Sequence, residues 1–376
     1  MYQVIIVGAG PAGAYLAYLL ATAGIKTLVL EKERFPRYKP CGGGVTPKAI
    51  NFLPFDLGAV IEDVVHTITF THRLDNPVTI TVNKPIAYMV SRERFDAFLA
   101  DKAKEAGAQI LEGVRVNRVE VTGGYVSVNA NAVEWQGKIL VGADGAFSVV
   151  ARSLGFGGRK MLAATLESEI PVPAATIKQS QGTIKIEYGL VPNGYAWIFP
   201  KAGHLSAGVW SNSAKQIKLR GLLEKFLQVE NLSKFSSGVR PLGWAIPVKP
   251  QPGELHRGRA LLLGDAAGLA DALTGEGIYA ALFSAHLAAK VIAEQVDQPV
   301  PDLQKYVNLV QEEMGADMAG ANRLTHWIPP ITGLIHSVLR RHQELVHEFM
   351  EVAGGNISYT NFLQTFRKQL RAALHL

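Results

Sequence analysis

The 376-residue chain has a single cysteine, Cys41, and this scarcity limits how the fold can be stabilised. One cysteine cannot form a disulfide within the chain, so the simplest expectation is a reducing, intracellular compartment and a cytoplasmic protein. The alternative interpretation is that Cys41 is a reactive thiol.

Long uninterrupted apolar segments are also lacking. The nearest candidate runs from Ile278 to Val296, and it contains His286, Lys290 and Glu294, which argue against a membrane-spanning helix. The apolar N-terminus has no basic region before it, so it is not interpreted as a targeting peptide. The sequence therefore predicts a protein that does not span a membrane.

Charge of one sign is not concentrated in the sequence. The chain has 38 Lys and Arg against 32 Asp and Glu, for a formal net charge of +6. Nucleic-acid binding needs clustered basic residues interleaved with aromatics, and no such stripe occurs, so no nucleic-acid partner is expected. An acidic protein partner and an anionic membrane surface stay as candidates. A hydrophobic content of 48% with 19% charged residues predicts a globular protein of two lobes.

The first 31 residues follow the pattern of a dinucleotide-binding unit. A β-branched run from Val4 to Val7 precedes GAGPAG at 8–13, helical spacing to Gly24, and a second strand that ends at Glu31. In such a unit the glycines allow a tight turn, close approach to a pyrophosphate, and packing of the helix on the strand, while the acid binds ribose hydroxyls. The alternative is a glycine-rich turn in an ordinary βαβ unit. The predicted cofactor-binding residues of this unit are Gly8, Gly10, Pro11, Ala12, Gly13, Glu31 and Lys32.

Two later segments repeat the order of strand, aspartate-containing turn and helix. GKILVGADGAFSVV (137–150) contains Asp144 and Gly145, and GRALLLGDAAG (258–268) contains Asp265. An aspartate at the carboxyl end of a strand suits a ligand site at the switch point of a doubly wound sheet. The glycine-rich start of the next helix, LTGEGI, presents free N–H groups and a positive dipole end that would favour an anionic reduced flavin. Together these motifs indicate FAD.

A second glycine motif of the same spacing is absent from the sequence. No dedicated nicotinamide domain is therefore predicted, and the electron donor is expected to be either NADPH that binds transiently or a protein such as reduced ferredoxin.

Seven short segments with strand-like alternation predict a second, mostly antiparallel β lobe, with substrate between the lobes. In GYAWIFP (194–200), Tyr195, Trp197 and Phe199 recur at period two, so their rings share one face of a strand. Two interpretations fit this row: a packed aromatic core, or the wall of a long apolar tunnel. The segments are VVHTITFTH, VTITV, IAYMV, TLESEI, GTIKIEYGL, GYAWIFP and HLSAGVW.

Three motifs, KPCGGGVTPKAI, GYAWIFPK and GDAAGLADALTGEGI, together resemble the geranylgeranyl reductase family of the p-hydroxybenzoate hydroxylase-like flavoprotein superfamily. Members of this family hydrogenate isolated double bonds in isoprenoid chains. The resemblance covers roughly residues 1–295. It implies Asp144 near the pyrophosphate, Asp265 at the ribityl chain, Arg92 beside the cofactor and the Val116 backbone against the adenine. Non-covalent FAD is expected because no His or Cys occurs in the loop that joins the first helix to the second strand. An exposed first-turn charge is the alternative for Arg92.

The cysteine lies in a glycine-bracketed turn ahead of a short helix, in which Thr46 is the N-cap and Pro47 the first residue. Glycines would let this turn run close to the isoalloxazine face, and the Cys41 thiol would position the alkene or protonate it. The alternative is a small buried hydrophobe. Catalytic roles are predicted for Cys41 and Gly42 and substrate contacts for Tyr195, Trp197 and Phe199, with no metal site. Further predicted cofactor-binding residues are Cys41, Gly42, Gly43, Arg92, Val116, Asp144, Gly145, Asp265, Gly275, Gly277 and Ile278.

The expected fold class is α/β: a doubly wound Rossmann-like FAD-binding domain, a second, mostly antiparallel β lobe, and C-terminal helices. The predicted FAD-binding domain comprises 1–63, 86–158 and 256–298, the substrate-binding lobe comprises 64–85 and 159–255, and a helical region spans 299–376. Within that region HWIPPITGLIHSVLRR (326–341) has the pattern of an amphipathic helix, which either packs on the core or lies on a membrane surface.

The function predicted from these features is an FAD-dependent reductase. It would saturate carbon–carbon double bonds of a prenyl, geranylgeranyl-type lipid by hydride transfer from reduced flavin. One alternative is a single-component flavin monooxygenase of similar fold. The other is a non-catalytic isoprenoid carrier that contains flavin.

Overall fold

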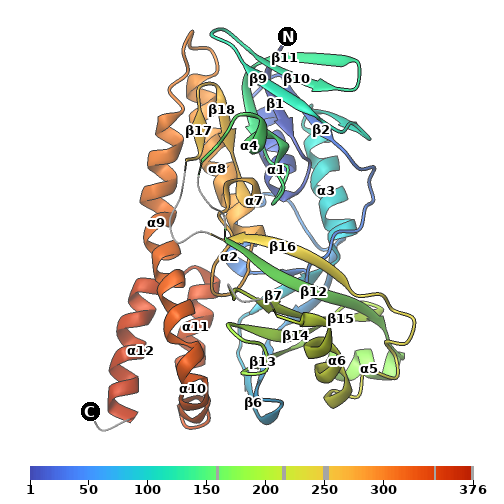
Figure 1. Cartoon of the computed structure of the whole chain (residues 1–376), viewed down its shortest axis with the longest axis vertical. Coiled ribbons are helices and arrows are strands. Elements are labelled where there is room, and N and C mark those ends of the chain that lie inside the picture. Colours follow the sequence, from blue (N-terminus) through green and yellow to red (C-terminus); the bar gives the residue numbers. More distant parts are fainter. Residues whose placement is uncertain (158–160, 214–216, 249–253, 343, 374–376) are drawn as a thin grey trace. The chain divides into compact units, whose positions relative to one another are not determined.

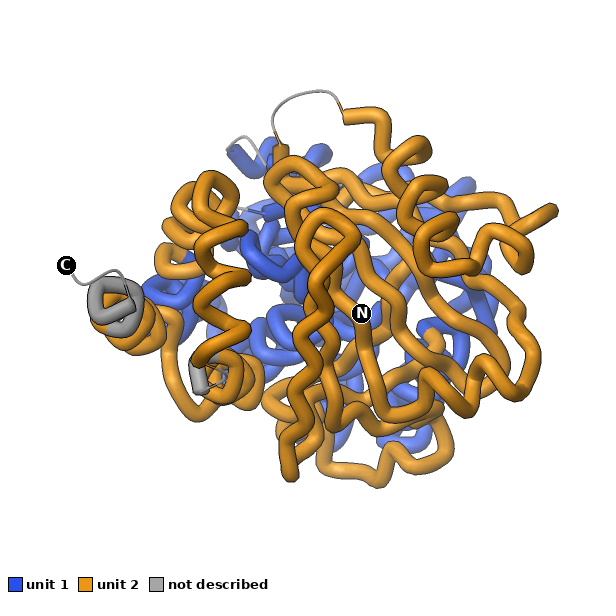
Figure 2. The backbone as a smooth tube through the Cα atoms, turned by 90° about the horizontal axis from the view of Figure 1, so that it is seen from below, with its two compact units in different colours: residues 1–39, 92–161, 246–318 blue, residues 40–91, 162–245, 319–376 orange. Residues whose placement is uncertain are grey.

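The computed structural model describes residues 1–157, 161–213, 217–248, 254–342 and 344–373. The chain forms two compact units, each built from three separate stretches of sequence, and Figure 2 colours them separately. Unit 1 comprises Met1–Lys39, Arg92–Met161 and Ile246–Met318, and unit 2 comprises Pro40–Ser91, Leu162–Ala245 and Ala319–Leu376.

Unit 1 contains a sheet with the strand order β17-β18-β11-β1-β2-β8, in which β18, β11, β1, β2 and β8 are parallel to one another and β17 is antiparallel to β18 (Figure 1). β10 continues antiparallel from β11 and pairs with β9. Val4 to Val7 of β1 are buried, as expected for a central strand of a parallel sheet. The strands are β1 (Tyr2–Val7), β2 (Thr27–Glu31), β8 (Gln109–Glu112), β9 (Arg118–Val121), β10 (Val126–Ala130), β11 (Val133–Gly142), β17 (His256–Arg257) and β18 (Ala260–Leu262).

Small residues let the helices of unit 1 pack closely. α1 contacts both α3 and α8, and its Ala14 and Ala17 are fully buried, as are Ala285 and Ala288 of α8. The buried Tyr306 hydroxyl donates a 3.0 Å hydrogen bond to the Leu262 carbonyl and so fixes α9 to β18. The helices are α1 (Pro11–Thr22), α3 (Arg92–Glu105), α4 (Val149–Ser153), α7 (Gly264–Ala267), α8 (Ile278–Gln295) and α9 (Gln304–Trp327), the last of which continues into unit 2.

Unit 2 is the mostly antiparallel β lobe that the sequence predicts. Its larger sheet has the order β16-β12-β15-β14-β13-β5-β6, in which β13 and β5 are parallel, and a smaller sheet has the order β3-β7-β4. The strands are β3 (Gly44–Val45), β4 (Ile61–Val65), β5 (Thr67–His72), β6 (Asp75–Thr81), β7 (Ala87–Val90), β12 (Met161–Pro171), β13 (Thr183–Tyr188), β14 (Gly194–Pro200), β15 (His204–Ser211) and β16 (Leu242–Val248).

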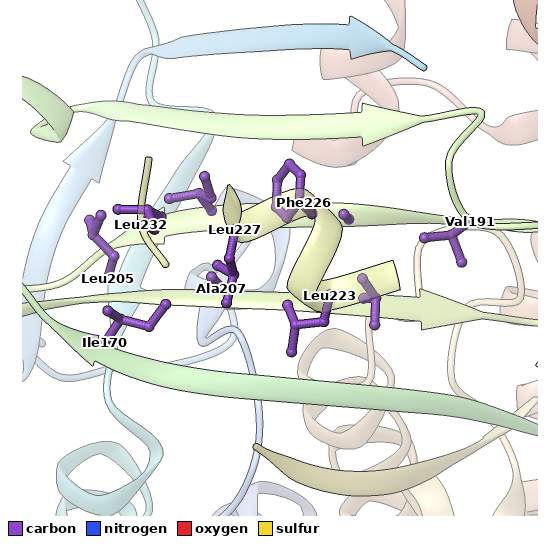
Figure 3. Packing of buried hydrophobic residues seen from close by; sticks show 11 residues of the cluster. Ile170, Val191, Leu205, Ala207, Leu223, Phe226, Leu227 and Leu232 are labelled. Atoms are coloured by element: carbon purple, nitrogen blue, oxygen red, sulfur yellow. The ribbon is translucent and has the colours of Figure 1, made fainter. Parts of the chain in front are cut away.

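One face of the larger sheet is covered by helix α6, as Figure 3 shows. Leu223 and Phe226 of α6 pack in one cluster with Ala196 and Ile198 of β14. Because side chains alternate along a strand, the aromatic residues at 195, 197 and 199 project from the opposite face of β14. The helices of unit 2 are α2 (Pro47–Ile50), α5 (Ala174–Ser180), α6 (Leu219–Val229), the 3-10 helix η1 (Pro329–Ile331), α10 (Thr332–Leu339), α11 (Glu344–Gly354) and α12 (Tyr359–Ala373).

The compact units divide the chain at other points than the predicted domains do. Residues 40–63 and 86–91 belong to unit 2, although the sequence groups them with the FAD-binding segments, and residues 299–318 belong to unit 1. The division by function remains a prediction. None of the helices in the described ranges combines the length and the apolar character needed to cross a bilayer.

Candidate flavin and substrate sites

The loop after β1 needs glycine at two positions for steric reasons. Gly8 has φ of +96°, and a Cβ there would lie 2.5 Å from the Ala143 carbonyl oxygen. A Cβ on Gly13 would lie 1.9 Å from the Gly8 carbonyl oxygen. Only glycine therefore allows α1 to pack this closely on the loop.

Gly10 lies in a different environment, with an extended backbone at φ −69° and ψ −175° that any residue can adopt. Within the described part of the chain, a Cβ built on Gly10 meets only Arg37 Nη2, at 3.9 Å. Pro11 follows as the first residue of α1, whose first-turn N–H groups have no acceptor within the helix and carry the positive dipole end. This open cradle, which a side chain would fill, fits a pyrophosphate group.

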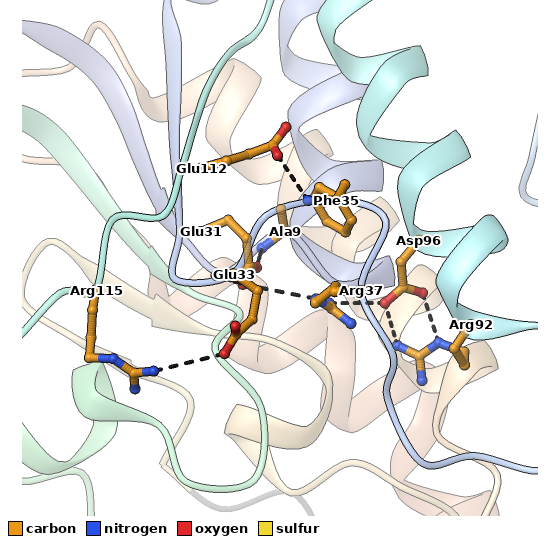
Figure 4. Close-up of polar contacts among 9 residues, drawn as sticks. All are labelled: Ala9, Glu31, Glu33, Phe35, Arg37, Arg92, Asp96, Glu112 and Arg115. Carbon is orange, nitrogen blue, oxygen red and sulfur yellow. Dashed lines mark hydrogen bonds and ion pairs between the residues drawn. The ribbon is translucent and has the colours of Figure 1, made fainter.

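Glu31 joins the end of β2 to the glycine loop, as Figure 4 shows. The side chain is buried; its Oε2 accepts a 2.7 Å hydrogen bond from the Ala9 N–H, and its Oε1 accepts one of 3.0 Å from the Glu33 N–H. A carboxylate has about four acceptor positions, so Glu31 retains capacity for ribose hydroxyls. Lys32, the next residue, is exposed.

A chain of alternating charges leads from Glu31 to helix α3 (Figure 4). Arg37 Nε lies 4.0 Å from Glu31 Oε1, and Arg37 Nη2 lies 3.0 Å from Asp96 Oδ2. Asp96 also accepts two hydrogen bonds of 2.7 Å from Arg92. Burial works to raise the pKa of Asp96, but the charge and hydrogen bonds of Arg92, with the charge of Arg37, hold the pKa below its ordinary value. Arg92 is thus a buried ion-pair partner, and its interpretation as an exposed first-turn charge is wrong.

No sequence motif indicated Arg37, yet its guanidinium lies nearest to the open side of Gly10. It rests over the Phe35 ring, with 5.2 Å from Cζ to the ring centroid. A guanidinium in this place can bind phosphate oxygens through paired N–H donors. A basic residue shortly after Glu31 could have indicated Arg37 as a phosphate ligand. Lys32 and Arg34 are also basic and lie nearer to Glu31 in sequence, so Arg37 did not stand out.

Asp144 has one oxygen engaged and one without a partner. Its Oδ2 accepts hydrogen bonds from the N–H groups of Val149 and Val150, at 2.6 and 3.2 Å, and so caps α4. Its Oδ1 is buried and has no hydrogen-bond partner among the described residues. Burial raises the pKa of Asp144, partly offset by a hydrogen bond with the Ser148 side chain and by these backbone hydrogen bonds. The free oxygen fits a hydroxyl or another donor of a bound nucleotide. Gly145 follows with φ of +78°.

The predicted residues near the start of α8 also come together. Asp265 lies in the first turn of α7, and its Oδ1 would be 3.2 Å from a Cβ on Gly277, the N-cap of α8. Gly275 has φ of +72°, and Ile278 is the buried first residue of α8. Asp271 lies within the motif GDAAGLADALTGEGI but was given no role from the sequence; its Oδ1 accepts 2.8 Å hydrogen bonds from the N–H groups of both Leu273 and Thr274 and shapes the loop.

The loop that carries Val116 is tied to the end of β2. Val114 N–H donates to the Glu31 carbonyl at 2.8 Å, and Gly113 N–H donates to the Glu33 carbonyl at 3.1 Å. Val116 itself is buried. This loop therefore lies beside Glu31, where the resemblance places the adenosine part of FAD. β8, which precedes this loop, pairs with β2, and β9, which follows it, pairs with β10.

In unit 2 the predicted catalytic turn packs on the predicted substrate strand. A Cβ on Gly42 would lie 2.9 Å from Phe199 Cδ2 and 3.1 Å from Trp197 Nε1. The ring centroids of Tyr195 and Trp197, and those of Trp197 and Phe199, are 6.1 Å apart. Trp197 is buried, whereas Tyr195 and Phe199 are half-buried. The three rings thus form one row, which is called the aromatic row below.

Two buried charged residues beside this turn, Glu167 and Lys201, were given no role from the sequence, although Lys201 is the last residue of GYAWIFPK and Glu167 lies in the segment TLESEI. Glu167 accepts a hydrogen bond from the Cys41 N–H, and Lys201 donates one to the Gly42 carbonyl. Thr46 and Pro47 lie as predicted, at the N-cap and the first position of α2.

Comparison with known proteins gives consistent matches. A family model described as an FAD binding domain matches residues 1–305. The chloroplastic geranylgeranyl diphosphate reductase of Nicotiana tabacum is 31% identical over 336 residues, covering 81% of this chain and 70% of that protein. The digeranylgeranylglycerophospholipid reductase of Thermoplasma acidophilum is 26% identical over 330 residues, covering 83% of each. The crystal structure of a geranylgeranyl bacteriochlorophyll reductase-like protein from Thermoplasma acidophilum has the same fold, with a TM-score of 0.79 at 22% identity over 98% of this chain and 99% of that one.

The family model covers more than half of the chain, and the region that it matches contains the glycine loop with its open pyrophosphate cradle. The tobacco relative is above 30% identical, and the match covers more than two thirds of both chains. The chain belongs to the geranylgeranyl reductase family of FAD-dependent oxidoreductases.

Proposed function

We propose that this oxidoreductase saturates carbon–carbon double bonds in the geranylgeranyl-type chain of a prenyl lipid. The observation that carries the proposal is the packing of the Cys41–Gly43 turn against Trp197 and Phe199 of the aromatic row. The two named relatives support it, since one is named for geranylgeranyl diphosphate and the other for digeranylgeranylglycerophospholipid. Both of these compounds carry geranylgeranyl chains.

FAD, when bound, supplies the hydride for this chemistry. The residues of unit 1 would divide its binding between them: Gly10 and the start of α1 would hold the pyrophosphate, and Glu31 would accept hydrogen bonds from ribose hydroxyls. Arg37 adds a positive charge beside the same cradle, and Asp144 Oδ1 offers a buried acceptor. Asp265 and Gly277, which lie close together at the start of α8, would make further contacts with FAD.

The residues of unit 2 bind and orient the substrate. Saturation of one double bond adds a hydride to one carbon and a proton to the other. The aromatic row offers an apolar surface for a prenyl chain, and the half-buried Cys41 thiol lies at the end of the turn that packs on this row. Gly43 N–H donates to Cys41 Sγ at 3.4 Å and so orients the sulfur. Cys41 either positions the alkene or donates the proton.

Replacing Cys41 with Ser tests this role directly. Ser keeps a small polar group but changes its acidity and softness, so oxidation of the reduced flavin by geranylgeranyl diphosphate is expected to slow by about tenfold or more. FAD content and the rate of flavin reduction are expected to stay unchanged, because the residues assigned to the pyrophosphate and ribose belong to unit 1. The measurement is anaerobic stopped-flow absorbance of the two half-reactions.

Cys41→Ala is the matched variant, since it keeps the small size without polarity. If only the Ala variant is slow, a polar group in this position suffices, and if both are slow, the thiol itself is required. Wild-type reoxidation rates in both variants would make Cys41 a small packing residue and remove it from the mechanism. If the wild-type flavin is reoxidised only when oxygen is present, the protein would be the flavin monooxygenase. If the prenyl substrate causes no reoxidation at all, the protein would be the non-catalytic isoprenoid carrier.

For the electron donor, we propose a small acidic carrier protein such as a reduced ferredoxin, with NADPH as the competing donor. The net charge of +6 supports the protein donor through charge complementarity. The Debye length falls from about 30 Å at 0.01 M to about 8 Å at 0.15 M salt, so flavin reduction by ferredoxin is expected to slow steeply over this range. Stopped-flow reduction with each donor across the same salt range is the measurement. Rapid, saturable reduction by NADPH with no response to ferredoxin would contradict the protein donor.

Contact with a membrane surface is the weaker of the proposed interactions. The apolar residues Val338 and Leu339 of α10 are buried within the protein, as is His336, which favours packing over a membrane-surface role for residues 332–339. Trp327, just before this segment, is exposed.

A further inference from the structure

Two buried charged side chains contact the turn that contains Cys41. Lys201 directly follows β14, and its Nζ donates 2.7 Å hydrogen bonds to the carbonyls of Gly42 and Val90. Glu167 lies on β12, and its Oε1 accepts a 2.7 Å hydrogen bond from the Cys41 N–H. Each of the two side chains belongs to a residue that is only 2% exposed.

Consecutive residues of the turn are held by different elements of unit 2. Glu167 of β12 holds Cys41, Lys201 after β14 holds Gly42, and the Val90 N–H of β7 donates to the Gly43 carbonyl at 2.9 Å. Gly43 has φ of +68°, and a Cβ there would lie 2.0 Å from the Val90 carbonyl oxygen and 2.4 Å from Lys201 Nζ. The turn therefore has no room to shift toward β7 or toward the ammonium.

Three successive glycines give this segment more backbone freedom than any other residue type would. A turn of this composition does not keep one conformation on its own, so the contacts from outside must select it. The two side chains do so through the backbone groups of Cys41 and Gly42, and they leave the Cys41 side chain half-buried, with its sulfur oriented by the Gly43 N–H.

Burying the Lys201 ammonium is energetically unfavourable, and this cost indicates that the side chain has a role other than stabilising the fold. Burial lowers the pKa of Lys201, partly offset by the nearby negative charges of Glu169, Glu62 and Glu167. Well-packed apolar residues of similar volume often serve stability as well as a buried ion pair does, or better. A buried cation that donates hydrogen bonds to one carbonyl of the turn and one of its neighbouring strand is thus better explained by what it holds in place.

We propose that Lys201 and Glu167 are positioning residues that hold the Cys41–Gly43 turn in the conformation required for substrate reduction. The reaction itself rests on the function proposed above. Lys201 fixes the Gly42 peptide from the side of β14 and β7, and Glu167 fixes the Cys41 peptide from β12. Together they set the direction in which the thiol leaves the turn.

Lys201→Met tests the proposal, because it removes the ammonium and keeps an unbranched side chain of similar length. Lys201→Arg retains N–H donors and charge, and Lys178→Met is the matched control, since Lys178 is exposed on α5 of the same unit. The first measurement is hydrogen exchange by mass spectrometry on peptides that span residues 40–45, made on the holoprotein without substrate. The second is the stopped-flow comparison of flavin reduction with reoxidation by geranylgeranyl diphosphate.

In Lys201→Met, exchange in residues 40–45 is expected to be about fivefold faster or more, since the turn opens more often. Reoxidation is expected to slow by about tenfold or more, because a small misplacement of a reacting group costs this much. FAD content and flavin reduction are expected to stay within about twofold. Lys201→Arg is expected to restore much of the reoxidation rate, and Lys178→Met to match the wild type.

Folded Lys201→Met with wild-type exchange in the turn would overturn the proposal. Faster exchange with unchanged reoxidation would also overturn it, because the contact would then be structural only. If Lys201→Met does not fold, Glu167→Leu takes its place, and wild-type exchange of the Cys41 amide in that variant would equally refute the assignment. The exchange measurement uses no substrate, so a wild type that fails to reduce prenyl substrates, with the exchange difference intact, would refute the proposed function separately.

Discussion

Replacing Gly10 with Val is expected to give a folded protein that retains less than about a tenth of the wild-type FAD. The backbone of Gly10 is extended, so Val can adopt it, and a Cβ there meets no other described atom closer than Arg37 Nη2 at 3.9 Å. The added isopropyl group would instead fill the open cradle beside the start of α1, where the pyrophosphate is expected. The measurement is the flavin-to-protein absorbance ratio after purification, with circular dichroism to verify folding.

Two further glycines serve as controls for this experiment. Gly123 is exposed, and a Cβ on it has no heavy atom within 4 Å, so Gly123→Val should bind FAD normally. Gly13→Val should fail to fold correctly, because its Cβ would lie 1.9 Å from the Gly8 carbonyl oxygen. Normal FAD content in folded Gly10→Val would remove the cradle from the account of cofactor binding.

Replacing Trp197 with Ala is expected to lower the free energy of unfolding by about 3–5 kcal/mol, the usual range for deleting a buried large aromatic side chain. Its ring lies over Gly208 of β15, where a Cβ would be only 2.2 Å from Trp197 Cζ2, and the ring lies between Tyr195 and Phe199 in the aromatic row. Chemical denaturation of the variant and the wild type measures this loss.

The same variant distinguishes a substrate wall from a packed core. If the aromatic row lines the path of the prenyl chain, reoxidation by geranylgeranyl diphosphate should fall by about tenfold or more in Trp197→Ala, while flavin reduction changes little. Trp327→Ala is the control, since Trp327 is exposed and lies outside the row. An equal loss in both half-reactions would assign Trp197 to the core alone.

Local motifs were predictable because their geometry depends on neighbours in sequence. The roles of Gly8 and Gly13 follow from the strand–turn–helix order, and both positions indeed have no space for a side chain. Likewise, alternation alone placed Tyr195, Trp197 and Phe199 on one face of β14, and the structure shows their rings in one row.

Partners that are distant in sequence were not predictable in this way. Arg37 meets Asp96, and Lys201 meets Gly42, only because the chain returns to the same place after many residues. Arg37 lies outside the motifs, and Lys201, although it ends GYAWIFPK, has no neighbour in sequence that indicates its partner. Buried charge pairs therefore became visible only once the fold was known.

The strand β16 was among those not predicted from the sequence, and it was missed for a physical reason. β16 (Leu242–Val248) contains Gly243 and Pro247, both of which are disfavoured in strands. It lies at the end of the strand order β16-β12-β15, and proline is tolerated at a sheet edge because an edge strand leaves one row of N–H groups unpaired. Alternation and propensity do not reveal such a position.

Product analysis tests the central claim most directly. Reduced protein is incubated with geranylgeranyl diphosphate without oxygen, and the extracted prenyl chain is analysed by mass spectrometry alongside an incubation with the Gly10→Val variant. We expect the prenyl chain to gain two hydrogen atoms for each double bond saturated, in step with flavin reoxidation, and the variant to give no such product. An unchanged chain with the flavin still reduced, or a product that appears only with oxygen and contains an added oxygen atom, would contradict the central claim.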